Sequence, residues 1–129
     1  GASAGGRRPG RRVFLPQGGA MSRYFPTTEE CSQHTIFPGV HIRTAAADSM
    51  MLSVVTLEPH AVVEEHEHPH EQVGMVLEGK AIFWIGGEEK TLQAGDLYRI
   101  PSHVRHRVVA LDQPVRALDI FHPVRQEYL

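Results

Sequence analysis

The chain has 129 residues, of which 41% are hydrophobic and 22% are charged, as is ordinary for a single soluble globular domain. Its formal net charge is −2, which argues against nucleic-acid binding by a basic face, and no apolar run is long enough to span a membrane. Cys31 is the only cysteine, so an internal disulfide is excluded, and we expect a reducing, cytoplasmic setting.

Residues 1–20 form a leader that differs in composition from the rest of the chain. It contains four arginines in a Gly/Ala-rich setting, whereas every acidic residue lies after Met21. Without the leader, 9 basic and 15 acidic residues remain, a net charge of −6. We therefore predict a flexible basic leader over 1–20 and one folded domain over 21–129. Artificially added or upstream-translated sequence, a twin-arginine address and a nucleic-acid-binding arm are alternatives for this segment.

After Met21, short apolar runs alternate with Gly- and Pro-containing turns, and no segment keeps a 3.6-residue period. The Gly86-Gly87 pair predicts a two-residue hairpin. Many short strands with closely spaced turns are typical of an antiparallel sandwich or barrel. The predicted strands are Val40–Thr44, Met50–Leu57, Val62–His68, Gln72–Leu77, Ala81–Ile85, Glu88–Leu92, Leu97–Ile100, His106–Val109 and Val115–Phe121.

Histidines are concentrated in the stretch His66-Glu67-His68-Pro69-His70-Glu71-Gln72. Two histidines separated by one residue point the same way on a strand but diverge on a helix. Neutral imidazole is a good ligand for divalent transition metals. The stretch therefore predicts a metal site on a β-scaffold.

Two spaced patterns resemble the paired motifs of the cupin superfamily. At the positions of the first motif, G-x5-H-x-H-x3-E-x6-G, this chain has His60, His66, His68, Gln72 and Gly79, so that His60 replaces a turn glycine. At the positions of the second, G-x5-P-x-G-x2-H-x3-N, it has Gly95, Pro101, His103, His106 and Ala110, so that His103 replaces a turn glycine and Ala110 an asparagine. The resemblance implies an all-β, single cupin barrel, a double-stranded β-helix or jelly roll. It also implies that His66, His68, Gln72 and His106 bind one divalent transition metal ion, with Zn, Ni, Mn and Fe as candidates.

Gln72 stands where the cupin motif usually has a glutamate. With three imidazoles and an amide, a bound divalent ion would keep its full charge and attract anionic ligands more strongly. The alternative is that Gln72 is only a hydrogen-bonding core residue and three histidines bind the metal. His70 could be a further ligand, a neighbour that moves protons, or a solvent-facing loop residue, and we favour the second role.

The C-terminal pattern D-x-F-x3-R consists of Asp119, Phe121 and Arg125. Together with H-x-H-P-H-E-Q, it resembles the small cupins of pectin and alginate breakdown, which linearise 4,5-unsaturated uronates. That resemblance implies catalytic roles for these three residues and an anionic small-molecule substrate. From periodicity alone, Asp119 would be an edge charge, Phe121 a core residue and Arg125 a solvated end.

Polyketide-cyclase-like cupins share the H-x-H-P-H-E-Q motif. The alternative enzyme is therefore a metal-dependent dioxygenase or polyketide cyclase that acts on an aromatic substrate. A non-catalytic small-molecule-binding cupin is a further alternative. Small cupins commonly pair through N-terminal strands, so the resemblance also implies a homodimer in which residues of Tyr24–Thr44 reach the second subunit.

Overall fold

The computed structural model describes residues 22–129, so the predicted leader lies outside the described residues. Strands account for most of the described chain, and two 3-10 helices, η1 (Thr28–Glu30) and η2 (Gln126–Tyr128), flank them. The strands are β1 (Ser32–Phe37), β2 (Val40–Ala46), β3 (Met51–Leu57), β4 (Val62–His66), β5 (Glu71–Glu78), β6 (Lys80–Ile85), β7 (Glu88–Gln93), β8 (Leu97–Ile100), β9 (His106–Ala110) and β10 (Val115–His122).

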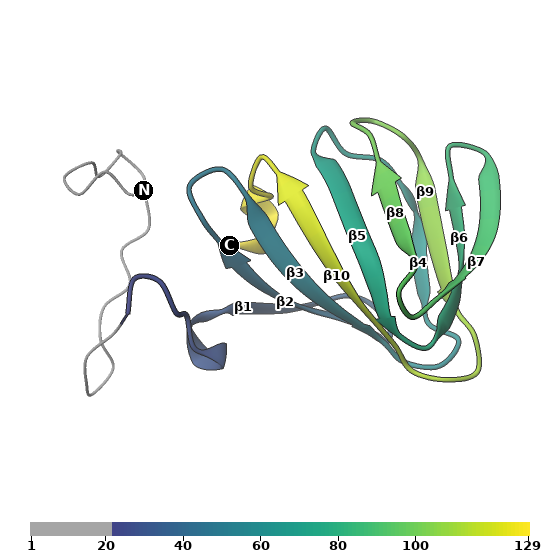
Figure 1. Ribbon diagram of the computed structural model, residues 1–129, viewed down its shortest axis with the longest axis horizontal. Coiled ribbons are helices and arrows are strands. Elements are labelled where there is room, and N and C mark those ends of the chain that lie inside the picture. Colours follow the sequence, from purple (N-terminus) through teal and green to yellow (C-terminus); the bar gives the residue numbers. More distant parts are fainter. Residues whose placement is uncertain (1–21) are drawn as a thin grey trace.

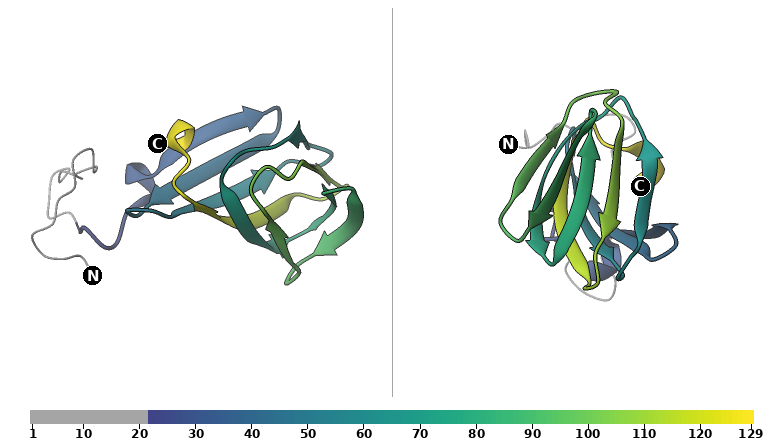
Figure 2. Two further views of the ribbon diagram at one scale, coloured as in Figure 1. Left: turned by 90° about the horizontal axis from the view of Figure 1, so that it is seen from above. Right: turned by 90° about the vertical axis from the view of Figure 1, so that its right-hand side faces the viewer.

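The strands form two antiparallel sheets. One has six strands in the order β1-β2-β3-β10-β5-β8, and the other has four in the order β4-β9-β6-β7. The last strand, β10, lies between β3 and β5 (Figure 1), so the C-terminal residues are central to the larger sheet. The two sheets curve around a common interior (Figure 2). The all-β barrel predicted from the sequence is confirmed.

Alternation along the strands creates the core. In β3 and β10 every second side chain is buried, which is the period of two expected when one face of a sheet packs inward. Each fully buried apolar side chain contributes roughly 1.5–3 kcal/mol to folding. The buried residues of the main cluster are Val40, Ile42, Val55, Leu57, Ala61, Val76, Ala81, Phe83, Leu92, Ala110, Val115 and Ala117.

Strand β1 was not predicted from the sequence. It is an edge strand that pairs only with β2 among the described strands, and its first four residues are polar. Its turn into β2 uses Gly39, whose φ of 74° lies in the left-handed region that glycine adopts at little cost. The Pro38-Gly39 pair was the available signal for this hairpin.

Two histidines occupy the turn positions at which the cupin motifs have glycine. His60 has a φ of 65° and His103 a φ of 63°, so both adopt the left-handed conformation that the motif glycines would favour. The backbone at these two turns therefore has the left-handed conformation that glycine adopts, although a histidine stands there. No helix among residues 22–129 is long and apolar enough to cross a membrane.

Candidate metal centre

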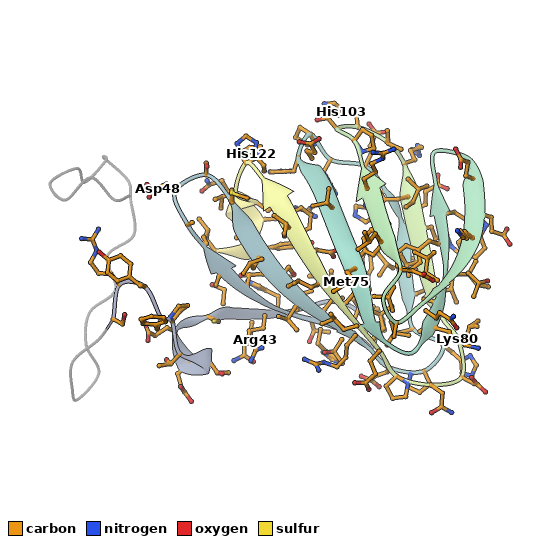
Figure 3. The ribbon with its side chains drawn as sticks, viewed as in Figure 1. Arg43, Asp48, Met75, Lys80, His103 and His122 are labelled. Atoms are coloured by element: carbon orange, nitrogen blue, oxygen red, sulfur yellow. The ribbon has the colours of Figure 1, made fainter. Side chains whose placement is uncertain are left out.

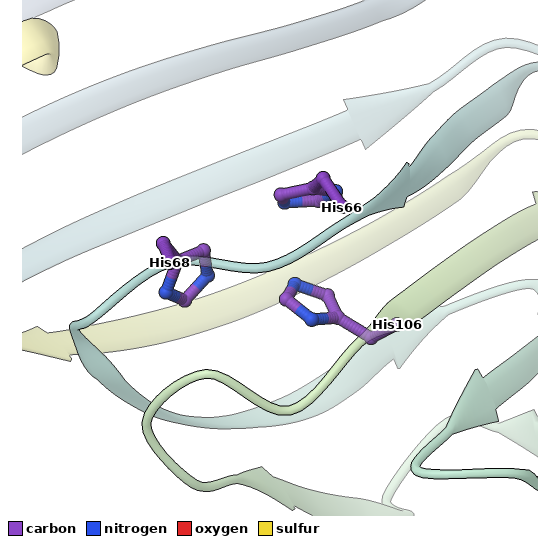
Figure 4. A group of neighbouring side chains, drawn as sticks. All are labelled: His66, His68 and His106. Carbon is purple, nitrogen blue, oxygen red and sulfur yellow. The ribbon is translucent and has the colours of Figure 1, made fainter.

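The motif histidines meet where the two sheets adjoin. His66 ends β4 and is paired with His106, the first residue of β9. His68 follows in the loop that leads to β5, and the three rings face one another (Figure 4). Their ring centroids are separated by 4.2 Å for His66 and His106, 5.0 Å for His68 and His106, and 5.6 Å for His66 and His68. The spacing thus predicted the meeting of His66 and His68, but the predicted strand Val62–His68 ends at His66, so His68 reaches the cluster from the loop.

Backbone contacts hold the two histidine-bearing loops together. The amide of His103 donates to the carbonyl oxygen of His68 at 2.8 Å, and the Ser102 hydroxyl donates to the carbonyl of Pro69. His103 and His122 mark the end of the barrel at which these loops lie, and Lys80 lies toward the other end (Figure 3). The loop between β8 and β9 therefore fixes His68 relative to His106.

Each of the three imidazoles uses its Nδ1 atom for a backbone carbonyl. The distances are 2.8 Å from His66 to Glu64, 2.9 Å from His68 to His70, and 2.9 Å from His106 to Val104. A carbonyl only accepts, so in the neutral ring Nδ1 carries the proton and Nε2 presents a lone pair. Carbonyl partners of this kind orient metal-binding histidines.

The donor set fits a divalent transition metal. One ligand atom from each of the three histidines lies within 4.8 Å of the others. His106 Nε2 is buried and has no hydrogen-bond partner among the described residues, although an uncompensated buried acceptor costs roughly 1–3 kcal/mol. A bound cation would remove that cost. The cluster of His66, His68 and His106 is therefore suited to a metal ion.

Burial keeps two of these rings neutral. It lowers the pKa of His68 to about 4, with the charge of Arg125 acting in the same direction and the His70 carbonyl opposing it. Burial also lowers the pKa of His106 to about 4, although the hydrogen bond to Val104 opposes the change. Metal binding requires neutral imidazole, so the rings need not lose a proton near neutral pH.

Gln72 joins this cluster from the second position of β5. Its side chain is buried, and Oε1 lies 3.1 Å from His68 Nε2. In the tautomer set by the His70 carbonyl, both of these atoms are acceptors, so a cation between them would satisfy both. Gln72 also hydrogen-bonds to Asp119, which is an acceptor for its amide NH₂ group. These contacts direct the amide oxygen toward the histidines.

The C-terminal residues face the same cavity. Asp119, Phe121 and Arg125 are 8%, 3% and 8% exposed, and all three line one cavity with His66, Gln72 and His106. The edge-charge and solvated-end interpretations of Asp119 and Arg125 therefore do not hold. Phe121 packs edge-on against His68, with ring centroids 5.7 Å apart.

Arg125 is held by aromatic faces and one carboxylate. Its Cζ atom lies 5.2 Å from the Phe121 ring centroid and 4.3 Å from that of Tyr128. Its Nη2 and Nε atoms donate to Glu127 Oε2 at 2.7 and 3.2 Å. These contacts set the orientation of the guanidinium and leave its Nη1 group for another acceptor.

Asp119 has the environment of a proton carrier. Burial raises its pKa to about 6, although hydrogen bonds from Tyr98 and Gln72 and the charge of Arg125 act in the opposite direction. A carboxyl group with a pKa near the working pH can both accept and donate a proton. Such perturbed carboxyl groups in cavities are candidates for function.

Two other histidines of the motif region lie outside this cluster. The His70 ring centroid is 5.6 Å from that of His68, but His70 does not belong to the three-histidine group, and its buried Nδ1 has no partner among the described residues. His103 is exposed, and its nearest charged contact is Glu67 at 3.8 Å. His70 therefore lies beside the cluster, and its role in moving protons stays a prediction.

Sequence reasoning missed two polar residues of the cavity. Tyr98 donates its hydroxyl hydrogen to Asp119, and Ser53 faces Asp119 across β3 and β10 with its hydroxyl buried and unpartnered among the described residues. Ser53 lies outside both motifs, and Tyr98 stands at an unspecified position of the second motif, between Gly95 and Pro101. The usable signal was Gly74, because an isolated glycine within a strand often marks a close approach of neighbouring groups.

Comparisons with known proteins agree with this geometry. A family model described as Cupin domain matches residues 53–121, more than half of the chain. An RmlC-like cupin from Shewanella frigidimarina NCIMB 400 is 28% identical with a TM-score of 0.75, and the match covers 84% of this chain and 97% of that chain. KdgF from Halomonas sp. is 29% identical with a TM-score of 0.75, and the match covers 84% of this chain and 100% of KdgF.

A more distant structure shares the fold alone. A variant of oxalate decarboxylase from Bacillus subtilis is 20% identical with a TM-score of 0.73, over 85% of this chain and 32% of that one. The family model, the two barrel structures and the three-histidine cluster all concern the same part of the molecule. The chain belongs to the cupin family and is similar to its KdgF-like members.

Proposed function

We propose that this cupin is a metal-dependent enzyme that opens and tautomerises 4,5-unsaturated uronates to linear keto sugar acids. One observation carries the proposal: the buried Asp119 and Arg125 line the same cavity as His66 and His106 of the three-histidine cluster. A buried carboxyl group with a raised pKa can move a proton, and a guanidinium can bind a substrate carboxylate. The D-x-F-x3-R pattern and the similarity to KdgF from Halomonas sp. support it.

The proposed metal ligands are His66, His68, Gln72 and His106. A bound divalent ion would act as a Lewis acid for an oxygen on which negative charge develops. The reaction has no redox step, so zinc, nickel, manganese and iron are all suitable candidates. The neutral ligand set would favour an anionic substrate.

Arg125 would bind the substrate carboxylate through the donors that Glu127 leaves free. Asp119 would accept the proton of the hemiacetal hydroxyl as the carbonyl forms and the bond to the ring oxygen breaks. The electron pair stays on the former ring oxygen as an enolate. Asp119 would then return the proton to the double-bond carbon that does not carry this oxygen, which gives the ketone. Phe121 would form the apolar wall that excludes water.

The direct test follows the absorbance of the conjugated double bond when metal-loaded protein is mixed with unsaturated galacturonate. We expect a metal-dependent decrease, and we expect Asp119→Asn to lower kcat by ~100-fold or more while metal stays bound. Asp112→Asn, at an exposed aspartate, is the matched control and should leave turnover unchanged. Absorbance loss no faster than the spontaneous rate would refute the uronate assignment, and ligand binding without turnover would favour a non-catalytic cupin.

A second candidate function rests on the deep wall of the cavity. Beyond the polar residues the lining is apolar, with Ile42, Val55, Phe83, Val108 and Val115 among its members. Such a wall suits an aromatic substrate of a dioxygenase or polyketide cyclase. Oxygen consumption in the presence of iron, with no effect on unsaturated uronates, would favour this alternative.

We also propose that two copies of the chain pair. On the outer face of the larger sheet, apolar side chains face one another across neighbouring strands, where an antiparallel sheet in contact with water is usually polar. Leu52 is 46% exposed, Val73 41% and Leu97 72%. The residues of this outer patch are Leu52, Val54, Val73, Met75, Leu97, Leu118 and Ile120. A second copy would cover the patch, with residues of Tyr24–Thr44 reaching across.

A further inference from the structure

Tyr98 reaches Asp119 across an intervening strand. Asp119 of β10 is paired with Gly74 of β5, and Gly74 is paired with Tyr98 of β8. Asp119 and Tyr98 are therefore two strands apart, a separation of roughly 10 Å at the backbone. The tyrosine side chain spans this separation and donates its hydroxyl hydrogen to Asp119 Oδ1.

Gly74 makes the contact possible. Its φ does not lie in the left-handed region, so the backbone does not require glycine. The surrounding side chains do require glycine, because a Cβ atom at this position would overlap the Tyr98 ring and hydroxyl and Asp119 Oδ1. Because Gly74 has no side chain, the Tyr98 ring and the Asp119 carboxylate can occupy the space next to the backbone of β5.

We propose that Tyr98 is a positioning residue that fixes the carboxylate of Asp119 for proton transfer. Its hydroxyl occupies Oδ1, while Gln72 bonds to the same carboxyl group from the metal side. Two donors from different strands would restrict rotation of the carboxyl plane of Asp119, which lines the cavity with His66 and His106. The inference rests on the proposed function, in which Asp119 carries the proton.

Packing alone does not account for the hydroxyl. The Tyr98 ring stacks against Phe83, with centroids 4.7 Å apart, and a phenylalanine would keep that contact. The oxygen adds a polar atom to a mostly apolar cavity wall, and Asp119 is its hydrogen-bond partner there. Burial of the hydroxyl is favourable because the carboxylate accepts its hydrogen.

The first test is Tyr98→Phe in the metal-loaded protein, with unsaturated galacturonate as substrate. We expect kcat to fall ~10- to 100-fold because the carboxylate loses its alignment, with KM, metal affinity and thermal stability nearly unchanged. Tyr24→Phe is the matched control, since the Tyr24 side chain is 69% exposed and does not line the cavity, and it should keep wild-type kcat. An unchanged kcat in Tyr98→Phe, or equal losses in both variants, would overturn the proposal.

A structural readout separates this inference from the proposed function. Crystal structures of the metal-loaded wild type and Tyr98→Phe compare the Asp119 side chain without any substrate. We expect Asp119 to turn or to occupy more than one conformer in the variant, even if unsaturated uronates prove not to be the substrate. A carboxylate that keeps its orientation without the hydroxyl would refute the positioning role while leaving the proposed function intact.

Discussion

Gln72 places its amide oxygen 3.1 Å from Nε2 of His68, where most cupin motifs would have a carboxylate. We predict that Gln72→Glu tightens divalent metal binding, because an anionic ligand replaces a neutral one. Turnover should fall ~10-fold or more, since the metal loses net charge and the NH₂ donor to Asp119 is lost. Calorimetric metal titration and the ultraviolet assay measure the two effects separately.

The control for this change is Gln33→Glu, which adds the same charge at an exposed position of β1. It should leave both metal affinity and turnover at wild-type values. If Gln72→Glu neither tightens metal binding nor alters turnover, Gln72 is only a hydrogen-bonding core residue.

The second prediction separates ligands from neighbours among the histidines. His106→Ala should lose stoichiometric metal, because it removes one of three clustered imidazoles. His70→Ala should retain it, with an affinity change of at most ~10- to 100-fold, as for groups that support ligands. Elemental analysis after dialysis measures metal content. Retention by His106→Ala, or complete loss in His70→Ala, would reverse the assignment.

The strand pattern shows how far local sequence determines this fold. Nine strands from β2 to β10 were predicted near their observed positions, because alternating apolar residues and glycine turns mark them. Strand β1 was not predicted because it is an edge strand with mostly polar residues, and its pairing depends on β2. An edge strand carries little hydrophobic periodicity of its own.

The candidate site also has a part that could be predicted from the sequence and a part that could not. The clustering of His66, His68 and His106 was readable from the motif spacing: β4 pairs His66 with His106, and His68 follows two residues later in the loop. The contact of Tyr98 with Asp119 could not be predicted from the sequence, since it depends on the strand order β10-β5-β8. Sequence alone gives no register between strands that are separated in the chain.

The backbone at His103 leads to the third prediction. A non-glycine residue in the left-handed region is strained by ~1 kcal/mol or more, so His103→Gly should raise the free energy of unfolding modestly, by up to ~1 kcal/mol. The contact with Glu67 joins exposed groups and contributes little. His122→Gly, in a strand, is the control and should destabilise. Thermal unfolding compares the two, and a destabilised His103→Gly would contradict the prediction.

Arg125 supplies the fourth prediction. Its planar guanidinium stacks on two rings and donates from several nitrogens, and lysine can reproduce neither arrangement. Arg125→Lys should raise KM for an unsaturated uronate by ~10-fold or more with a smaller change in kcat, because a bidentate contact to the carboxylate is lost. The exposed Arg116→Lys is the control. An unchanged KM would show that Arg125 does not bind the substrate.

The outer patch of the larger sheet gives the fifth prediction. If a second copy covers it, the protein should have twice the 14.4 kDa mass of the chain when light scattering is measured during size-exclusion chromatography. Leu52→Lys should shift the particle to the mass of one chain, since a lysine ammonium is rarely buried without a partner. Thr91→Lys, exposed on β7 of the other sheet, adds the same charge and should leave the dimer intact. A wild-type protein with the mass of one chain would refute the dimer, and a dimer that survives Leu52→Lys would place the interface away from this face.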